Sequence, residues 1–408
     1  MVLQSDIQLA FESQRGLLDL RNDLVKRTVF DRFESTGQHI EVITGIRRSG
    51  KSTLLKQLTA RFGNIAYFNF EDSRIHGFEL NDFQKLDTVI GNGIEAYFFD
   101  EIQNVPSWEV FVRQLHDRGE KIFITGSNAS LLSSELGTRL TGRHIRHELF
   151  PFSYAEFLSL KNSENHSGAF SQYLTQGGFP EFLKTGNPEV LQNLLYDIVY
   201  RDIAIRHGIR NSGSLMDLTL YLVSNLGKEM SYNNLRKMFQ FGSANTVSDY
   251  LSWLADSYLF CYLPRFSWSA RNISVNPRKI YVVDNGIASA NTLSFTGDSG
   301  RLLENAAYMF LRQQPVTVYY FREKFECDFV VFEKKKCRLA IQVCENLNHD
   351  NLKRETAGLL EAMEYFSLQQ GYILTRDQED EMKTNQGAIH VMPLYRFISQ
   401  LNNLFIQN

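Results

Sequence analysis

The sequence predicts an α/β fold, with a parallel sheet in the first 150 residues and smaller helical and mixed modules after it. Two observations support this prediction. Short β-rich runs alternate with helical segments from residue 38 to about residue 150, as in parallel sheets covered by helices. A glycine-rich loop at residues 45–53 joins the first of these runs to a helical segment. In parallel sheets such loops lie at the carboxyl edge, where ligands bind.

Local sequence patterns predict each element in turn. Residues 1–35 have the spacing of an amphipathic helix, with leucines interleaved among charged residues. The strands of the first sheet are predicted at residues 39–44, 65–70, 96–99, 121–125 and 145–149. After Pro151, helices are predicted at residues 154–160, 170–176, 189–206 and 214–226. A mixed region begins near residue 278, with strands predicted at residues 279–283, 317–322, 327–333, 339–343 and 371–375.

Composition and charge exclude several classes of protein. Hydrophobic residues make up 43% of the chain and charged residues 22%, which is ordinary for a globular protein. The formal net charge of −3 creates no overall attraction to nucleic acid or anionic lipid, so any basic surface must be local. The four cysteines include no CxxC pair, and we expect reduced thiols. Because there is no basic leader and no run of about 18 apolar residues, we expect a cytoplasmic protein without membrane contact.

Residues 45–52 have the spacing Gly-x-x-x-x-Gly-Lys-Ser of a phosphate-binding loop. Gly45 and Gly50 permit the backbone to approach a polyphosphate, with successive N–H groups pointing inward. Lys51 would reach the β- and γ-phosphates, and the hydroxyl of Ser52 would ligate Mg²⁺. A glycine-rich turn before a helix is the alternative. The predicted nucleotide contacts are Gly45, Arg48, Ser49, Gly50, Lys51, Ser52 and Thr53, with ATP and Mg²⁺ as cofactors.

Two carboxylates follow an apolar run about fifty residues after Lys51. This run ends in Asp100 and Glu101. Nucleotide-hydrolysing enzymes with a phosphate-binding loop need two such carboxylates at the carboxyl end of an apolar strand. Asp100 would hold the Mg²⁺ shell, and Glu101 would orient and polarise the attacking water. An acidic turn after a strand is the alternative interpretation. Together with the loop, the pair predicts hydrolysis of ATP.

Further polar residues follow the next strands. Asn128 or Ser127, after the run at residues 121–125, would contact the γ-phosphate or the water; capping of the following helix is the alternative. Arg143, or Arg139 before it, would stabilise transition-state charge as an arginine finger, in cis or in trans. The alternative for these arginines is a solvated helix end. Arg47 and Arg48 could contact phosphate or a partner.

Several short runs of the sequence resemble prokaryotic AAA+-type ATPases that carry a C-terminal domain of unknown function. The matching runs are residues 44–53, 100–103, 125–128, 140–143, 151–153, 177–181, 279–286, 300–305, 326–329 and 354–355. The resemblance covers nearly the whole chain. It implies an ATPase core at residues 1–150, a helical lid at 151–226, a winged-helix-like module at 227–277 and a restriction-endonuclease-like α/β domain at 278–408. It implies no cellular role.

The region from residue 227 to residue 260 has the pattern of a helix-turn-helix, with helices predicted at residues 231–239 and 244–255. Residues 201–279 contain ten Lys or Arg and five Asp or Glu, a balance that suits contacts with nucleic-acid phosphates. The outward face of the second helix, however, offers no arginine or lysine for base edges. Its predicted outward residues are Asn245, Ser248, Asp249 and Ser252. Contact with DNA and docking of a protein therefore both remain open.

The last domain carries residues at spacings similar to the nuclease signature Glu…Asp…Glu-x-Lys. They are Glu304, Asp328, Gln342 and Cys344. Gln342 replaces an acid that would bind a divalent metal, and Cys344 replaces the lysine that would steady the hydroxide. We therefore expect that the fold persists without nuclease activity.

Taken together, these patterns predict a Mg²⁺-dependent ATP-hydrolysing switch. It would couple nucleotide state to a macromolecular partner, DNA or protein, through the C-terminal half, and it could form a homo-oligomer. One alternative is an ATP-coupled nuclease of mobile-element or defence type. A second is a signalling scaffold that retains its nucleotide without turnover.

Overall fold

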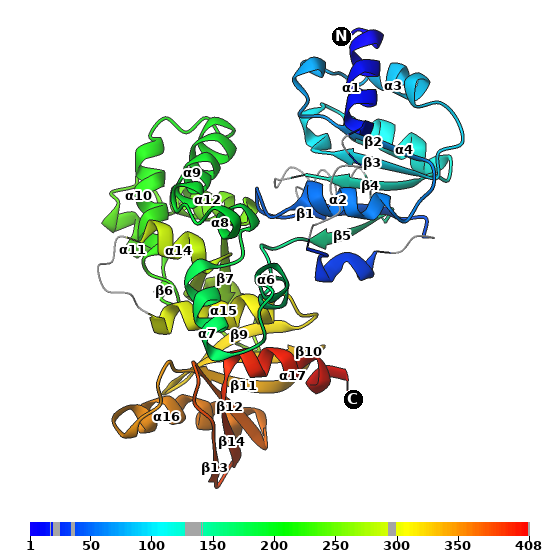
Figure 1. The fold of residues 1–408 in the computed structure, drawn as a ribbon. Helices are drawn as coiled ribbons and strands as arrows, with labels where there is room; N and C mark the ends of the chain where they lie inside the picture. Colours follow the sequence, from blue (N-terminus) through cyan, green and yellow to red (C-terminus); the bar gives the residue numbers. More distant parts are fainter. Residues whose placement is uncertain are drawn as a thin grey trace. The chain divides into compact units, whose positions relative to one another are not determined.

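The computed structural model describes residues 1–16, 18, 25–33, 37–126, 140, 142–292 and 299–406. The chain divides into two compact units, residues 1–152 with 256–258 and residues 153–255 with 259–408. The first unit contains a parallel sheet and the second contains a larger mixed sheet (Figure 1), which confirms the predicted fold class. Within the described residues, no helix is long and apolar enough to cross a membrane.

The sheet of the first unit has the order β2-β3-β4-β1-β5, and every neighbouring pair is parallel. Its strands are β1 (Ile40–Thr44), β2 (Ile65–Asn69), β3 (Ala96–Asp100), β4 (Lys121–Thr125) and β5 (His144–Glu148). All five strands predicted from the sequence are confirmed. Because the strands are parallel, the ends of β1, β3 and β4 meet at one edge of the sheet.

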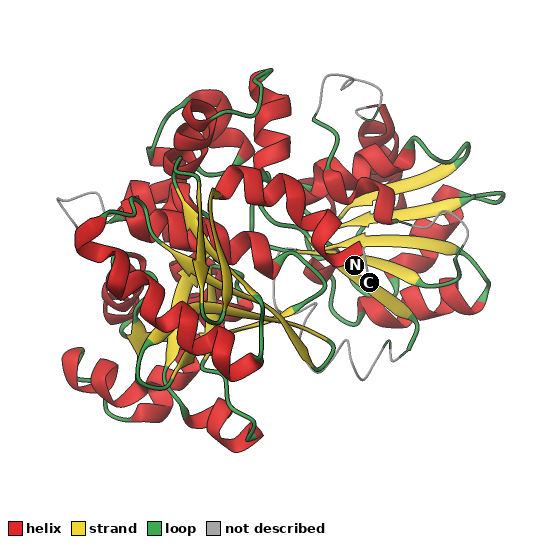
Figure 2. Cartoon of the chain, turned by 90° about the horizontal axis from the view of Figure 1, so that it is seen from below, coloured by secondary structure: helices red, strands yellow, loops and turns green. Residues whose placement is uncertain are grey.

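Helices cover both faces of this sheet (Figure 2). One face packs against α1 (Gln4–Gly16), α3 (Asp82–Ile90) and α4 (Trp108–Asp117), and the other packs against α2 (Lys51–Thr59). Successive side chains of a strand point to opposite faces, so Phe99 joins the first layer while Phe98 joins the second. Every residue of β1, β3 and β4 is buried, as expected for the centre of a two-sided sheet. Two short 3₁₀ turns complete this part, at Ser73–Ile75 and Ile102–Asn104.

The N-terminal segment differs from the prediction of one helix over residues 1–35. The helix α1 ends at Gly16, and residues 25–27 are not helical. Arg27 has an extended backbone (φ −74°, ψ 137°) and is followed by a 3₁₀ helix at Thr28–Arg32. With this extended backbone, the guanidinium of Arg27 reaches the carbonyl oxygen of Ser49 in the loop at residues 45–53. The leucines at 17, 20 and 24, which suggested the longer helix, lie outside the described residues.

The second unit begins with helices and a small three-stranded sheet. The helices are α6 (Tyr154–Lys161), α7 (Ser167–Gln176), α8 (Pro180–Thr185), α9 (Glu189–Asp197), α10 (Ser212–Val223), α11 (Tyr232–Met238), α12 (Ala244–Asp256), α13 (Ala270–Val275) and α14 (Asn285–Asn291). The segment predicted as one helix at residues 189–206 is helical, but Ile198–Ile205 is a π-helix. Strands β6 (Glu229–Met230), β7 (Phe260–Pro264) and β8 (Arg278–Val282) pair in the order β6-β8-β7 beside the two helices predicted as a helix-turn-helix.

The mixed sheet of the second unit has the order β13-β14-β12-β11-β10-β9. Its strands are β9 (Thr317–Arg322), β10 (Glu326–Glu333), β11 (Lys336–Val343), β12 (Gln370–Thr375), β13 (Asp380–Thr384) and β14 (Gly387–Pro393). Helix α16 (His349–Phe366) packs on β10, β11 and β12, while α15 (Ser299–Arg312) and α17 (Leu394–Ile406) also contact the sheet. The hairpin β13–β14 was not predicted, because β13 is mostly exposed and β14 alternates buried with partly buried residues instead of showing an apolar run.

Candidate nucleotide site

The loop between β1 and α2 has a backbone that requires glycine. Gly45 has φ 142°, and a Cβ placed there would lie 2.1 Å from the carbonyl oxygen of Leu149. Gly50 has φ 97° and directly precedes the first residue of α2. Any other residue at Gly45 would therefore meet both backbone strain and a collision with the chain that follows β5. The predicted phosphate-binding loop thus has the conformation that its glycines suggested.

Two buried hydroxyls in and beside this loop lack a hydrogen-bond partner within the described part of the chain. The hydroxyls of Thr44 and Ser49 have no hydrogen-bond partner among the described residues. No side chain caps the first turn of α2 there either. Lys51 is buried, and its ammonium donates to the carbonyl oxygens of Gly45 (3.1 Å) and Ile46 (3.0 Å). Because unpartnered buried hydroxyls and uncapped helix N–H groups are costly, this loop suits a ligand with several acceptor oxygens.

Asp100 is a fully buried carboxylate surrounded by hydroxyl donors. It accepts hydrogen bonds from Ser52 (3.0 Å), Tyr67 (2.8 Å) and Thr125 (2.5 Å). Burial raises the pKa of Asp100, although these hydrogen bonds oppose the rise. The structure therefore brings together Ser52 and Asp100, the two residues predicted to share a Mg²⁺ ion.

Glu101 follows in a strained conformation, with φ 52°. Its backbone N–H donates to the hydroxyl of Thr125 (3.0 Å), and its carboxylate accepts a hydrogen bond from the amide of Gln103 (2.5 Å). Glu71, just after β2, belongs to the same acidic group: burial and then the charge of Glu101 raise the pKa of Glu71. The site therefore concentrates carboxylates at the edge of the sheet where the loop lies.

Sequence reasoning missed Tyr67, Thr125 and Gln103. Tyr67 lies in an apolar run interpreted only as a buried strand, and Thr125 lies in another such run and in the matching run 125–128, without a role at the site. Their polar atoms reach Asp100 because β2 and β4 flank β3. A signal was available in Thr125, the last residue of its strand, since the ends of neighbouring parallel strands share one edge. No local signal points to Tyr67, because its contact depends on the strand order.

Sequence reasoning also missed Arg27, whose side chain holds the loop in place through hydrogen bonds. Its guanidinium donates to the carbonyl oxygens of Ser49 (2.8 Å) and Phe150 (2.7 Å) and lies over the ring of Phe152 at 5.0 Å. The side chain is buried. Arg27 thus joins the loop to the segment after β5, the same segment that approaches Gly45.

The predicted arginine finger lies away from its own loop. The carbonyl of Arg143 accepts a hydrogen bond from the N–H of Ile40 (2.9 Å), at the amino end of β1. Five strand residues at about 3.3 Å each separate this end from Gly45, roughly 16 Å in total. The guanidinium instead lies 3.8 Å from the carboxylate of Asp117. The role of Arg143, in cis or in trans, stays a prediction, and its place at the amino end of β1 fits action in trans better.

Several other predicted positions can be placed only in part. Asn128, Ser127 and Arg139 lie outside the described residues. Arg48 is exposed and has φ 63°. The side chain of Thr53 is partly buried in the first turn of α2. The sensor role of Asn128 stays a prediction.

In the second unit, three of the four residues that resemble a nuclease signature lie together. Glu304 and Asp328 both bind the ammonium of Lys279, and the side-chain oxygen of Gln342 accepts the N–H of Asp328 (3.3 Å). Cys344 instead contacts the carbonyl of Asn346. Among the described residues, no group of three or more His, Cys, Asp or Glu is arranged to hold a metal ion. Lys279 is one of the ten Lys or Arg counted as suiting phosphate contacts, and its burial makes it inaccessible for such a contact.

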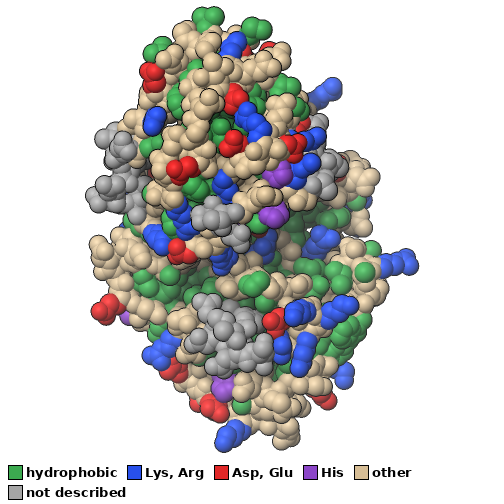
Figure 3. All heavy atoms as spheres, turned by 90° about the vertical axis from the view of Figure 1, so that its right-hand side faces the viewer, with side chains coloured by type: hydrophobic (Ala, Val, Ile, Leu, Met, Phe, Trp, Pro, Cys, Tyr) green, Lys and Arg blue, Asp and Glu red, His purple; other side chains and the backbone are tan. Residues whose placement is uncertain are grey.

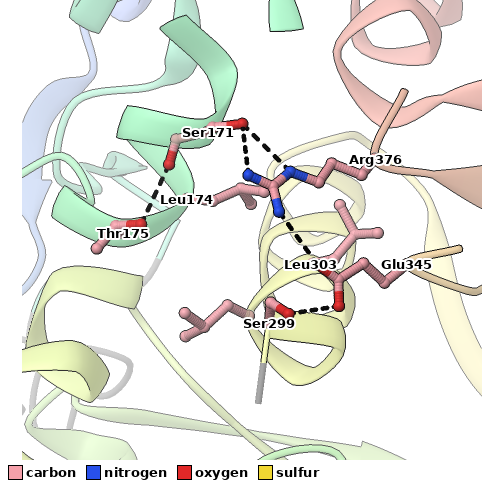
Figure 4. A pocket seen from close by; sticks show the side chains of 8 residues that line it. Ser171, Leu174, Thr175, Ser299, Leu303, Glu345 and Arg376 are labelled. Carbon is pink, nitrogen blue, oxygen red and sulfur yellow. Dashed lines mark hydrogen bonds and ion pairs between the residues drawn. The ribbon is translucent and has the colours of Figure 1, made fainter. Parts of the chain in front are cut away.

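A small hollow in the second unit and the distribution of charged side chains on one face are two further surface features. A hollow of about 50 Å³ in the second unit is lined by residues of α7, α15 and the ends of β11 and β12 (Figure 4). Arg376 points into it and donates to Ser171 (3.1 Å) and Glu345 (3.2 Å), so these groups satisfy one another. This volume holds a few waters rather than a substrate. On the face drawn in Figure 3, basic side chains are interspersed with acidic and apolar ones.

The two hydrogen bonds that Arg27 donates lead to a testable prediction. The change Arg27→Met removes the hydrogen bonds to the carbonyls of Ser49 and Phe150, so we expect the free energy of unfolding to fall by about 3 kcal/mol. We also expect weaker ATP binding, because one of these carbonyls belongs to the loop. Urea unfolding and equilibrium binding of a fluorescent ATP analogue measure the two effects.

Arg61→Met is the matched control. Arg61 also donates to two carbonyls, those of Phe33 (2.6 Å) and Phe30 (2.8 Å), but neither carbonyl lies in the loop. We expect this variant to lose stability while its affinity for the nucleotide stays unchanged. Equal affinities in the two variants would contradict a role of Arg27 in shaping the loop.

Comparison with known proteins identifies two families along the chain. A family model described as an AAA domain matches residues 37–158, and one described as a domain of unknown function (DUF8612) matches residues 167–298. Among solved structures, AMPPCP-bound DnaA from Aquifex aeolicus is 12% identical, covers 62% of this chain and 89% of its own, and has a TM-score of 0.28. The Aeropyrum pernix ORC1 protein in complex with DNA is 13% identical, covers 71% and 91%, and has a TM-score of 0.27. These scores are too low to support any argument.

Full-length relatives are closer in sequence. An uncharacterized protein of Methanocaldococcus jannaschii is 34% identical over 393 residues, which cover 88% of this chain and 88% of the relative. An uncharacterized protein of Haemophilus influenzae is 31% identical over 341 residues, which cover 77% of this chain and 85% of the relative. The chain therefore belongs to the family of AAA-domain proteins that includes these two uncharacterized proteins.

Proposed function

We propose that this protein binds Mg·ATP at residues 45–53, hydrolyses it, and couples the nucleotide state to a macromolecular partner. One observation carries the proposal: Asp100 lies at the end of β3 within hydrogen-bond distance of Ser52, the residue after the loop lysine. A carboxylate and a hydroxyl from two different elements form the kind of oxygen ligand set that Mg²⁺ prefers.

The residues present fit the nucleotide. The unpartnered hydroxyls of Thr44 and Ser49 and the uncapped N–H groups of α2 are donors available to phosphate oxygens. Lys51 would exchange its present carbonyl partners for the β- and γ-phosphates. The Mg²⁺ ion would neutralise charge on these phosphates, held by Ser52 and Asp100. Arg48 and Thr53 are the proposed flanking contacts.

Glu101 is the proposed general base. Its backbone is fixed by Thr125, and its carboxylate is held by Gln103, so the side chain is positioned before any water arrives. Glu71 adds a second carboxylate close by, because the charge of Glu101 contributes to raising its pKa. Repulsion between these two groups would favour proton uptake at the site. Asn128 is the proposed contact to the γ-phosphate or the water.

Two variants test hydrolysis. Lys51→Ala should lose ATP binding, whereas Glu101→Gln should bind ATP but release phosphate about 10²- to 10⁴-fold more slowly, since it lacks the base. Steady-state phosphate release and nucleotide binding measure these effects. Glu12→Gln, an exposed change on α1, is the control. Normal turnover in both variants would refute the proposal, and a single burst without further turnover would favour a nucleotide-loaded scaffold.

Arg143 provides a test of assembly. Since it lies at the opposite edge of the sheet from its own loop, its proposed action is in trans, on a neighbouring copy of the chain. We expect Arg143→Ala and Lys51→Ala each to be inactive alone and to regain phosphate release when mixed, because one supplies the site and the other supplies the arginine. Arg146→Ala, which removes an exposed arginine of β5, is the control. This variant should release phosphate without being mixed with a second variant. Mixing without recovery would contradict action in trans.

The partner that we propose is DNA, contacted by the helices α11 and α12. On α12, Asn245, Asp249 and Ser252 are exposed while Val247 and Leu251 are buried, which leaves one face free of the core. Basic residues on α11, Arg236 and Lys237, are available for phosphates. We expect duplex DNA to change the rate of phosphate release, and this effect to weaken in the double variant Arg236→Ala, Lys237→Ala and at higher salt. A rate that DNA leaves unchanged would instead favour a protein partner.

A further inference from the structure

Lys279 is a buried cation at the centre of three carboxylates in the second unit. Its ammonium lies 2.8 Å from Asp328, 2.8 Å from Glu326 and 3.2 Å from Glu304. Only 3% of the Lys279 side chain is exposed. The carboxylates come from β10 and α15, whereas the lysine comes from β8, so the cluster joins the three-stranded sheet to the mixed sheet.

Neighbouring groups hold these carboxylates in place. The second oxygen of Asp328 accepts the backbone N–H of Val343 (3.0 Å) on the adjacent strand β11. The oxygen of Glu304 that faces Lys279 also accepts the hydroxyl of Tyr281 (2.7 Å). A Cβ added to Gly227 would lie 2.8 Å from the other oxygen of Glu304. The carboxylates of Asp328 and Glu304 are therefore fixed in orientation, whereas that of Glu326 is 35% exposed.

The charges around Lys279 explain why its buried amine is protonated. Burial by itself would favour a neutral amine, but the negative charges of Asp328 and Glu304 outweigh it and raise the pKa of Lys279. Burial raises the pKa of Glu304 to about 7, and the positive charge of Lys279 opposes this rise. Removal of one partner from such a buried group leaves uncompensated charge, which is strongly destabilising.

The geometry points to a cation site that the chain fills with its own lysine. Oxygens from three carboxylates converge on one point at 2.8–3.2 Å, while a calcium-sized ion binds its oxygens at about 2.3–2.6 Å. We propose that Lys279 is the resident cation of this carboxylate cluster and that its ammonium excludes divalent ions from it. The proposal is independent of ATP hydrolysis by the first unit.

Terbium luminescence tests this proposal on the full chain. Tyr281, bonded to Glu304, would sensitise a Tb³⁺ ion bound in the cluster. Tyr67 would do the same for an ion at Asp100, so every sample carries Asp100→Asn. In this background the variants are Lys279→Met, Asp328→Asn and the double variant Lys279→Met, Asp328→Asn.

We expect no saturable emission that depends on Asp328 while Lys279 is present. Lys279→Met should gain one saturable Tb³⁺ site per chain, and the double variant should lose it. Folding of Lys279→Met only in the presence of Ca²⁺ would also support the proposal, because the ion then replaces the ammonium. If neither variant that lacks Lys279 folds, the comparison is between the Asp100→Asn protein and the same protein with Asp328→Asn. Equal Tb³⁺ emission from these two proteins supports the proposal.

Three results would overturn the proposal. The first is a Tb³⁺ site in the protein with Lys279 that Asp328→Asn removes, since the cluster would then be open to ions. The second is a folded Lys279→Met protein without a site. The third is a Lys279→Met protein that stays unfolded even with Ca²⁺ while the double variant folds, since the lysine would then only compensate charge.

Discussion

The carboxylate of Asp100 is the group on which the architecture of the first unit depends. It is fully buried at the carboxyl edge of the sheet, and a buried carboxylate is stable only with polar partners. Hydroxyls from α2, β2 and β4 supply them: Ser52, Tyr67 and Thr125. The start of α2, the middle of β2 and the end of β4 must therefore all lie beside the end of β3. The same requirement fixes the start of α2, and with it the loop that precedes the helix.

The two units stabilise buried carboxylates in different ways. Asp100 is surrounded by neutral hydroxyls, which leave its negative charge uncompensated, and burial raises its pKa. Asp328 and Glu304 are paired with the ammonium of Lys279, which compensates their charge within the chain. A divalent cation would gain electrostatic energy at Asp100, whereas at Lys279 it would first have to displace an ammonium. This contrast is the physical basis for proposing metal chemistry in the first unit and none in the second.

Strand direction separates residues that are close in function but distant in space. In a parallel sheet, residues after the strands gather at one edge and residues before them gather at the other. Asp100 and Thr125 lie at or after strand ends and join the loop, whereas Arg143 precedes β5 and lies at the far edge. This placement is the reason for proposing that Arg143 acts in trans.

The sequence by itself determined the five strands of the first sheet, the loop at residues 45–53 and the pairing of Ser52 with Asp100. These features follow from local patterns: apolar runs, glycine spacing and a lysine followed by a serine. Only the tertiary structure decided that Tyr67 and Arg27 belong to the site and that Lys279 is buried instead of facing solvent. The reason is that these contacts depend on strand order and on chain segments distant in sequence. Arg27 meets Phe150 across more than a hundred residues, and Lys279 meets Asp328 although their strands belong to separate sheets. No local pattern in the sequence carries that information.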